Sequence, residues 1–117
     1  CGTIHTQNTL KEESYIMQKV KTTKLDNILL KKNIGFIKID VEGHEKNVIK
    51  GAVNIIKNSN PNLLVEIEER HSKEKVEDTI NFINSLGYKS YFCKKNDLVK
   101  TSKLTDYKLK NNYIFLK

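Results

Sequence analysis

Two acidic residues, Asp40 and Glu42, follow directly after Ile34–Ile39, a short apolar run typical of a buried strand. A carboxylate in that position could accept the proton of a substrate hydroxyl or hold the charged end of a cofactor. It could equally cap the free N–H groups of a following helix and complement the helix dipole, which stabilises a helix by about 0.3–1 kcal/mol. From the residue types alone, both roles stay open for Asp40 and Glu42.

Gly43 and His44 complete this short segment. A glycine lets the backbone adopt conformations that other residues resist and lets it approach a ligand closely, although an ordinary tight turn would explain Gly43 as well. His44 could act as a base because imidazole titrates near neutral pH, but a single histidine at the start of a helix is more often an exposed surface residue. We therefore keep both residues as candidates for the site.

A second group of acids, Glu66 and Glu68, lies at the end of the apolar run Leu63–Ile67. The carboxyl ends of parallel strands meet at one edge of a sheet, where ligands bind, so we predict substrate contacts for both glutamates. A paired structural carboxyl is the alternative for Glu66. Carboxylates and histidines from adjacent strand ends could also meet over a metal ion; the candidates are Asp40, Glu42, Glu45, Glu66, Glu68, His44 and His71. However, the chain has no His-x-x-x-His pair and no pair of cysteine ligands. We expect no metal site.

The segment between these two apolar runs has helical periodicity. Its apolar residues recur at i, i+3, i+4 and i+7, which predicts a helix of about three turns with one apolar face. These residues are Ile49, Ala52, Val53 and Ile56. The helix should end before Pro61, because proline disfavours helical geometry at the residue that precedes it.

The run Leu63–Ile67 is too uniformly apolar for one face to lie in water, so it predicts a strand with helices on both sides. A helix should follow, with Ser72 as its N-cap and Gly87 in a left-handed conformation after its end. Its apolar positions are Val76, Ile80 and Ile83. Two last strands are expected at Tyr88–Cys93 and Asn112–Leu116.

The first part of the chain has weaker signals. We expect a loop or a partial upstream element over residues 1–19, with a short strand at Met17–Thr22 and a helical turn at Leu25–Leu30. The order of elements then predicts an α/β fold over residues 20–117, the second half of a doubly wound sheet with mostly parallel strands and a terminal antiparallel hairpin.

The bulk properties favour a small domain without a polymeric partner. The 117 residues carry a net charge of +7, but Arg70 is the only arginine and the lysines are spread along the chain. We therefore expect a solvated basic surface and no nucleic acid or membrane partner. Two distant cysteines and the absence of an apolar run of about 18 residues favour a cytoplasmic location.

Four segments together resemble the signature of the FkbM methyltransferase family. They are Lys38–Glu45, Gly51–Ala52, Val65–Glu66 and the preceding Val20–Asp26. The resemblance extends from about residue 20 to 90, and its pieces stand in the family's order and spacing. It implies a Rossmann-like class I methyltransferase sheet, of which this chain would supply the fourth to the seventh strand.

The resemblance also implies methyl transfer from S-adenosylmethionine to a hydroxyl of a sugar or natural product. It supports Asp40 and Glu42 as functional acids; with the residue chemistry above, we predict catalytic roles for Asp40, Glu42 and His44, and cofactor contacts for Asp40 and Gly43. Family members begin with a strand, a glycine-containing turn and an acid that binds the ribose; these are missing here, and Gly2 lies in the wrong context for that turn. We therefore expect the C-terminal part of the domain, which alone binds the cofactor poorly.

Two other functions stay open. The charge of +7 and the missing cofactor motif could belong to a non-catalytic basic interaction module, in which a Rossmann-like half-sheet binds an acidic partner. A different doubly wound enzyme could use the same sheet edge for other chemistry, because a fold does not determine a reaction. The sequence also leaves a homo-oligomer open.

Overall fold

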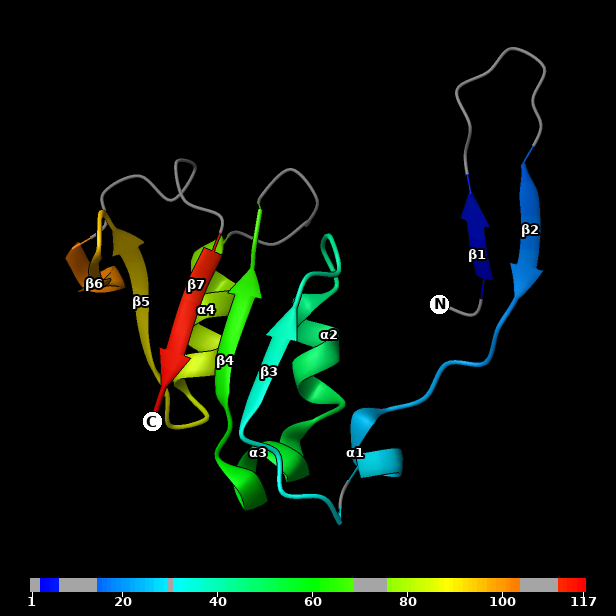
Figure 1. Ribbon diagram of the computed structural model, residues 1–117, viewed down its shortest axis with the longest axis horizontal. Helices are drawn as coiled ribbons and strands as arrows, with labels where there is room; N and C mark the ends of the chain where they lie inside the picture. Colours follow the sequence, from blue (N-terminus) through cyan, green and yellow to red (C-terminus); the bar gives the residue numbers. More distant parts are fainter. Residues whose placement is uncertain (1–2, 7–14, 30, 69–75, 104–111) are drawn as a thin grey trace.

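The computed structural model describes residues 3–6, 15–29, 31–68, 76–103 and 112–117. A five-stranded sheet forms the body of the molecule (Figure 1). In spatial order its strands are β3 (Phe36–Ile39), β4 (Asn62–Glu66), β7 (Asn112–Leu116), β5 (Lys89–Lys94) and β6 (Asp97–Lys100). The α/β class is confirmed, and the strands predicted at Ile34–Ile39 and Leu63–Ile67 are present as β3 and β4.

The expectation of mostly parallel strands is wrong for the described sheet. Only β3 and β4 pair in parallel, whereas β4 with β7, β7 with β5, and β5 with β6 all pair antiparallel. The reason is the position of β7, which enters between β4 and β5 in the opposite direction and separates two strands that share one direction. The antiparallel pairing of the last two predicted strands is confirmed, but the closing hairpin is formed by β5 and β6.

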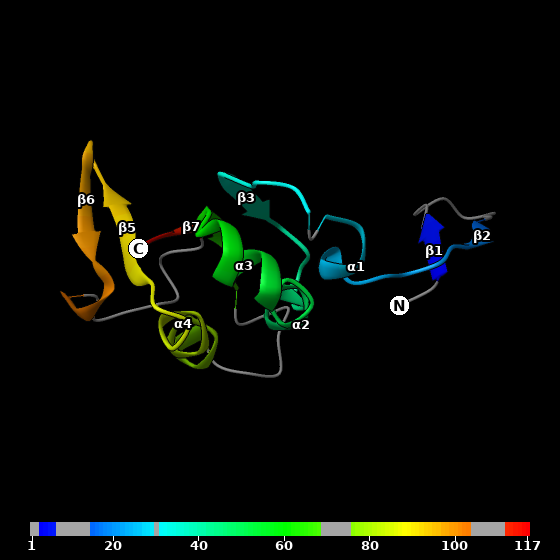
Figure 2. The same cartoon turned by 90° about the horizontal axis from the view of Figure 1, so that it is seen from below.

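The helices α2 (Glu45–Lys50), α3 (Val53–Ser59) and α4 (Val76–Asn84) lie on one face of the sheet (Figures 1 and 2). The prediction that helices cover both sides is wrong for the described part of the chain, since none of its helices covers the opposite face. There Leu64 of β4 is half-buried, whereas its neighbours Leu63 and Val65 are fully buried against the helices.

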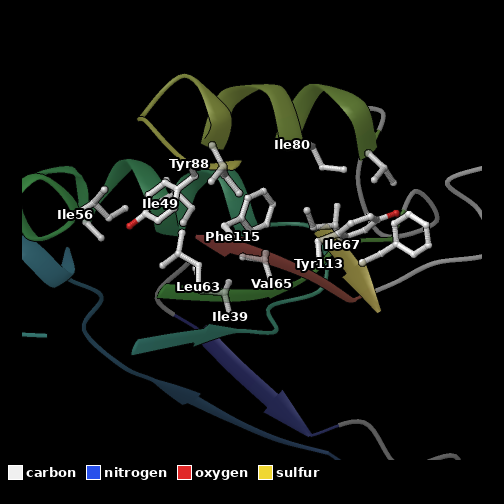
Figure 3. Close-up of a cluster of buried hydrophobic side chains, with 14 residues drawn as sticks. Ile39, Ile49, Ile56, Leu63, Val65, Ile67, Ile80, Tyr88, Tyr113 and Phe115 are labelled. Atoms are coloured by element: carbon white, nitrogen blue, oxygen red, sulfur yellow. The ribbon is translucent and has the colours of Figure 1, made fainter. Parts of the chain in front are cut away.

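The core is the layer between β4, β7 and these helices (Figure 3). Leu63 and Val65 pair in register with Phe115 and Tyr113 of β7, and all four side chains have no exposed surface. Burial of an aliphatic side chain of this size contributes about 1.5–3 kcal/mol. The helices add Ile49, Ile56, Val76, Ile80 and Ile83.

The single helix predicted between β3 and β4 is divided into α2 and α3. The break lies at Gly51 and Ala52, and no side chain of its own segment caps the start of α3. The cap comes from Asp26 of α1 (Leu25–Leu29), whose carboxylate accepts hydrogen bonds from the N–H groups of Asn54 and Ile55 at 3.1 and 3.0 Å. The Asp26 N–H also donates to the Gly51 carbonyl at 2.9 Å, so α1 is joined to the helix break from both sides.

The end of β7 is tied to the end of α3. Lys117 Nζ donates to Asn60 Oδ1 at 2.8 Å and lies 4.9 Å from the ring centre of Tyr88. The Tyr88 hydroxyl donates to the Pro61 carbonyl at 2.6 Å, and burial raises the pKa of Tyr88 to about 12. Gly87 has a φ of 100°, which confirms the left-handed conformation expected after α4.

The strands β1 (Thr3–Thr6) and β2 (Ile16–Lys19) pair antiparallel and stand apart from the body (Figure 1, right). Where a loop or partial element was expected over residues 1–19, the structure therefore has a two-stranded hairpin. Ile16 and Met17 of β2 are exposed. The expected N-cap Ser72 lies outside the described residues. In the described part of the chain, no helix is long and apolar enough to cross a bilayer.

Candidate active site at the carboxyl ends of the strands

Asp40 and Glu66 lie next to each other at the carboxyl ends of β3 and β4. The parallel register pairs Ile39 with Val65, which places Asp40 opposite Glu66. Because side chains alternate along a strand, the buried Ile39 and Val65 point toward the helices and the two acids follow on the opposite face. The Asp40 carboxyl lies close enough to Glu66 to raise the pKa of Glu66. The acids predicted at two separate strand ends thus form one pair.

The pair changes the acidity of Glu66. The hydrogen bond with Asp40 raises the pKa of Glu66 above its ordinary value of 4.5, and partial desolvation and the charges of Asp40 and Glu68 raise it further. Lys38 opposes this shift. Glu66 therefore holds a proton at a higher pH than a solvated glutamate does, and its ionised form is the stronger proton acceptor.

The turn after β3 is built around two residues with positive φ. Glu42 has a φ of 48° and Gly43 a φ of 104°, so a glycine occupies the position where a side chain would be most strained. Glu42 itself adopts a conformation that costs a non-glycine residue on the order of 1 kcal/mol. This turn carries the chain from Asp40 into α2 within four residues.

Glu45, the first residue of α2, stabilises the turn that precedes this helix. Its side chain is 2% exposed, and its Oε1 accepts a hydrogen bond from the Gly43 N–H at 2.9 Å. In the sequence, Glu45 stands out only as a member of the family signature and as one of the candidate metal ligands. A signal was available, because a glutamate in the first turn of a helix often reaches back to a free N–H group. Glu45 thus holds the turn that precedes α2, through the Gly43 N–H.

His44 lies away from the carboxyl pair. It is exposed at the start of α2, makes no side-chain cap for that helix, and lines an open groove of about 740 Å³ together with Asn47, Val48 and Gly51. Neither Asp40 nor Glu66 lines this groove. The structure therefore brings together Asp40, Glu66 and Glu68, and places Glu42, Gly43 and His44 in the adjoining turn.

The described residues of this region do not form a cluster of metal ligands. Among the residues that the structure describes, no group of three or more histidine, cysteine, aspartate or glutamate side chains could hold an ion. His71, which the sequence offered as a ligand, lies outside the described residues. A pair of neighbouring carboxyls such as Asp40 and Glu66 can bind hydroxyl or ammonium groups and accept protons.

Comparison with known proteins identifies the family. Residues 3–90 match the family described as the methyltransferase FkbM domain. The match begins at β1, so it includes the hairpin as well as the segments from Val20 to Glu66 that carry the resemblance. No curated protein and no solved structure matches the chain. Because the family match covers most of the sequence, the chain belongs to the FkbM methyltransferase domain family.

Proposed function

We propose that this domain transfers a methyl group from S-adenosylmethionine to a hydroxyl of a sugar or natural product, with the Asp40–Glu66 pair as the proton acceptor. Family membership supports methyl transfer in general. The observation that supports a hydroxyl acceptor is the raised pKa of Glu66 beside Asp40 at the strand ends. A hydroxyl, unlike an amine, needs a base for its proton as its oxygen becomes the nucleophile.

S-adenosylmethionine, when bound, supplies a methyl group activated by its sulfonium. The hydroxyl oxygen must lie within roughly 3–3.5 Å of the methyl carbon and in line with the bond that breaks. Glu66 and Asp40 take the hydroxyl proton at a carboxylate oxygen, and a positioned base of this kind accelerates such a step about 10²–10⁴-fold. We assign Glu68, whose charge acts on Glu66, to a second hydroxyl of the acceptor.

The described residues fit part of the cofactor. The positive φ of Gly43 permits a close backbone approach, and the exposed Asp40 carboxylate suits a ribose hydroxyl or the ammonium group. The strand, glycine turn and helix that would approach the cofactor are not found before β3 among the described residues 3–6, 15–29 and 31–35. The segment that joins β2 to α1, residues 20–24, contains no glycine. We propose that this chain supplies one side of the cofactor site and binds the cofactor weakly by itself.

Calorimetric titration tests this proposal. S-adenosylmethionine is titrated into the 117-residue chain and, in parallel, into the product of the whole reading frame that contains it. Binding by the longer product alone supports a divided site, and a labelled methyl group on a hydroxylated acceptor then supports the reaction. Tight binding by the 117 residues would overturn the divided site. Binding by neither protein would overturn the cofactor assignment and favour the basic interaction module.

A further inference from the structure

The hairpin of β1 and β2 lies apart from the five-stranded sheet in both views (Figures 1 and 2). Every residue of β2 is exposed, and so is Tyr15, which precedes it. An isolated two-stranded hairpin is only marginally stable in water, because it has neither a third strand nor a layer packed on one face. No described helix covers this hairpin, so a further strand would stabilise it.

Three consecutive side chains of the hairpin are large, apolar and exposed. Tyr15 is 62% exposed, Ile16 78% and Met17 65%. Because side chains alternate along a strand, Tyr15 and Met17 lie on one face of the hairpin and Ile16 on the other. Neither face is turned toward a core. All three side chains are covered together only by a neighbour that reaches both faces, as an added strand does.

The outer side of β2 presents backbone groups that could pair with such a strand. β1 pairs with one side of β2, and no other described strand pairs with it. Proteins commonly protect a free edge with proline or with charged residues. β2 contains no proline and no acid, and its one charged residue is Lys19 at its end. The edge strand β6, by contrast, has a charged residue at each end, Asp97 and Lys100.

A second copy of β2 fits this edge. Two identical strands that pair antiparallel are related by a two-fold axis, so each copy gives and receives the same contacts and the assembly closes as a dimer. With the axis at Met17, the two Met17 side chains face each other and Ile16 lies opposite Gln18. Tyr15 then lies opposite Lys19, which brings an ammonium group to an aromatic ring and keeps the two lysines apart.

The edge strand β3 needs such a contact less. Phe36 at its start is 59% exposed, but Ile39 is buried and Ile37 packs against the core, so the helices and β4 already hold this strand. Residues 20–24 separate the hairpin from α1 and the body. A contact through β2 therefore leaves the strand ends that carry Asp40 and Glu66 open.

We propose that β2 is a dimerisation edge, which pairs antiparallel with β2 of a second copy of this chain. The hairpins of the two copies then form one sheet of four strands. The interface is small, below roughly 1,200 Å², so the dimer is weak and reversible. This inference goes beyond the proposed function and is independent of it, because it uses neither the carboxyl pair nor the cofactor.

Sedimentation equilibrium of the 117-residue chain tests the dimer. The monomer has a mass of 13.6 kDa, and we expect the measured mass to approach twice that value as the chain reaches about 0.5 mM. Met17→Glu places like charges on the two-fold axis and should raise the Kd of the dimer at least about tenfold. Ile28→Glu makes the same change at a 60% exposed residue of α1 and should leave the Kd unchanged.

A cross-link locates the axis. After Cys1 and Cys93 are replaced by serine, Met17→Cys should form a disulfide between two copies under mild oxidation, because residues on the axis come within disulfide reach. Gln18→Cys is the matched control. Pairing about Met17 leaves its two copies diagonal to each other, roughly 7–8 Å apart, so this variant should cross-link much more slowly.

Three results would overturn the inference. The first is a monomer at every concentration while circular dichroism shows a folded chain. The second is a dimer that Met17→Glu leaves intact. The third is a dimer that is lost in Phe36→Glu and kept in Met17→Glu, which would assign the contact to the edge of β3. Thermal unfolding of each variant shows that the body, whose core does not include β2, is still folded.

Discussion

The carboxylate of Asp26 accepts a hydrogen bond from the N–H of Ile55, 29 residues later in the chain, at 3.0 Å. This contact supplies α3 with the cap that Ala52 lacks. It also explains physically why an acid at position 26 and the pair Gly51–Ala52 occur in one signature: the first provides the cap and the second provides the break that needs it.

Asp26→Ala should lower the free energy of unfolding by about 1–2 kcal/mol, because two N–H groups at the start of α3 lose their acceptor. Urea denaturation followed by circular dichroism measures the change. Asp97→Ala removes an exposed acid from β6 and should change the stability by less than about 0.5 kcal/mol. Equal stability of the two variants would contradict the capping role.

Glu66→Gln should make the protein more stable at neutral pH. The folded-state pKa of Glu66 is raised, so its favourable contribution is present below about 4.5 and is lost as the pH rises through the raised value. The glutamine keeps a hydrogen bond to Asp40 without the like charge. We expect a higher Tm than the wild type at pH 7 and no gain at pH 4, measured by thermal unfolding, with Glu77→Gln on α4 as the control. A lower Tm at pH 7 would show that the pair is not repulsive.

The same substitution should impair catalysis. In the protein that binds the cofactor, Glu66→Gln and Asp40→Asn should each lower kcat about 10²–10⁴-fold if the pair accepts the hydroxyl proton. Transfer of a labelled methyl group measures the rate, and the wild-type rate should rise with pH as Glu66 ionises. Asp78→Asn, at an exposed position of α4, serves as the control. A stabilised Glu66→Gln variant with full activity would exclude Glu66 as the base.

Glu45→Ala should cost about 2–3 kcal/mol, because the partly buried Gly43 N–H loses its acceptor and the buried Glu45 side chain leaves a cavity. Glu45→Gln keeps an acceptor oxygen and should cost less. Hydrogen exchange at the Gly43 amide gives a local readout: it should become faster in Glu45→Ala than in Glu45→Gln. Unchanged exchange in both variants would mean that another group holds the turn.

Local patterns were sufficient to predict the two strands that carry the candidate site. Continuous apolar runs located β3 and β4, and the parallel pairing of those strands brings Asp40 and Glu66 together without further information. Glu45 was missed as a structural residue because acidic side chains near a helix start are ambiguous until burial is known. The raised pKa of Glu66 depends on the strand register, which no local pattern contains.

Long-range pairing was not predictable in the same way. The insertion of β7 between β4 and β5 depends on contacts between residues far apart in the chain. The alternation of buried and exposed side chains within a strand does not reveal these contacts, because it is the same beside a parallel or an antiparallel neighbour. The division into α2 and α3 was hidden because Ile49, Ala52 and Ile56 keep helical spacing across the break. The strand β6 follows a two-residue turn in which Lys95 has a φ of 59°, a turn without the usual glycine.

The place of β7 in the sheet has a consequence for synthesis on the ribosome. β4 and β5 are joined only through β7, the last strand described, so the hydrogen bonds on one side of each stay unmade until residues 112–116 have left the exit tunnel. Up to that moment the nascent chain exposes the apolar faces that Tyr113 and Phe115 later cover. Chaperone protection of the nascent chain should therefore end abruptly, when β7 emerges, and not gradually along the chain.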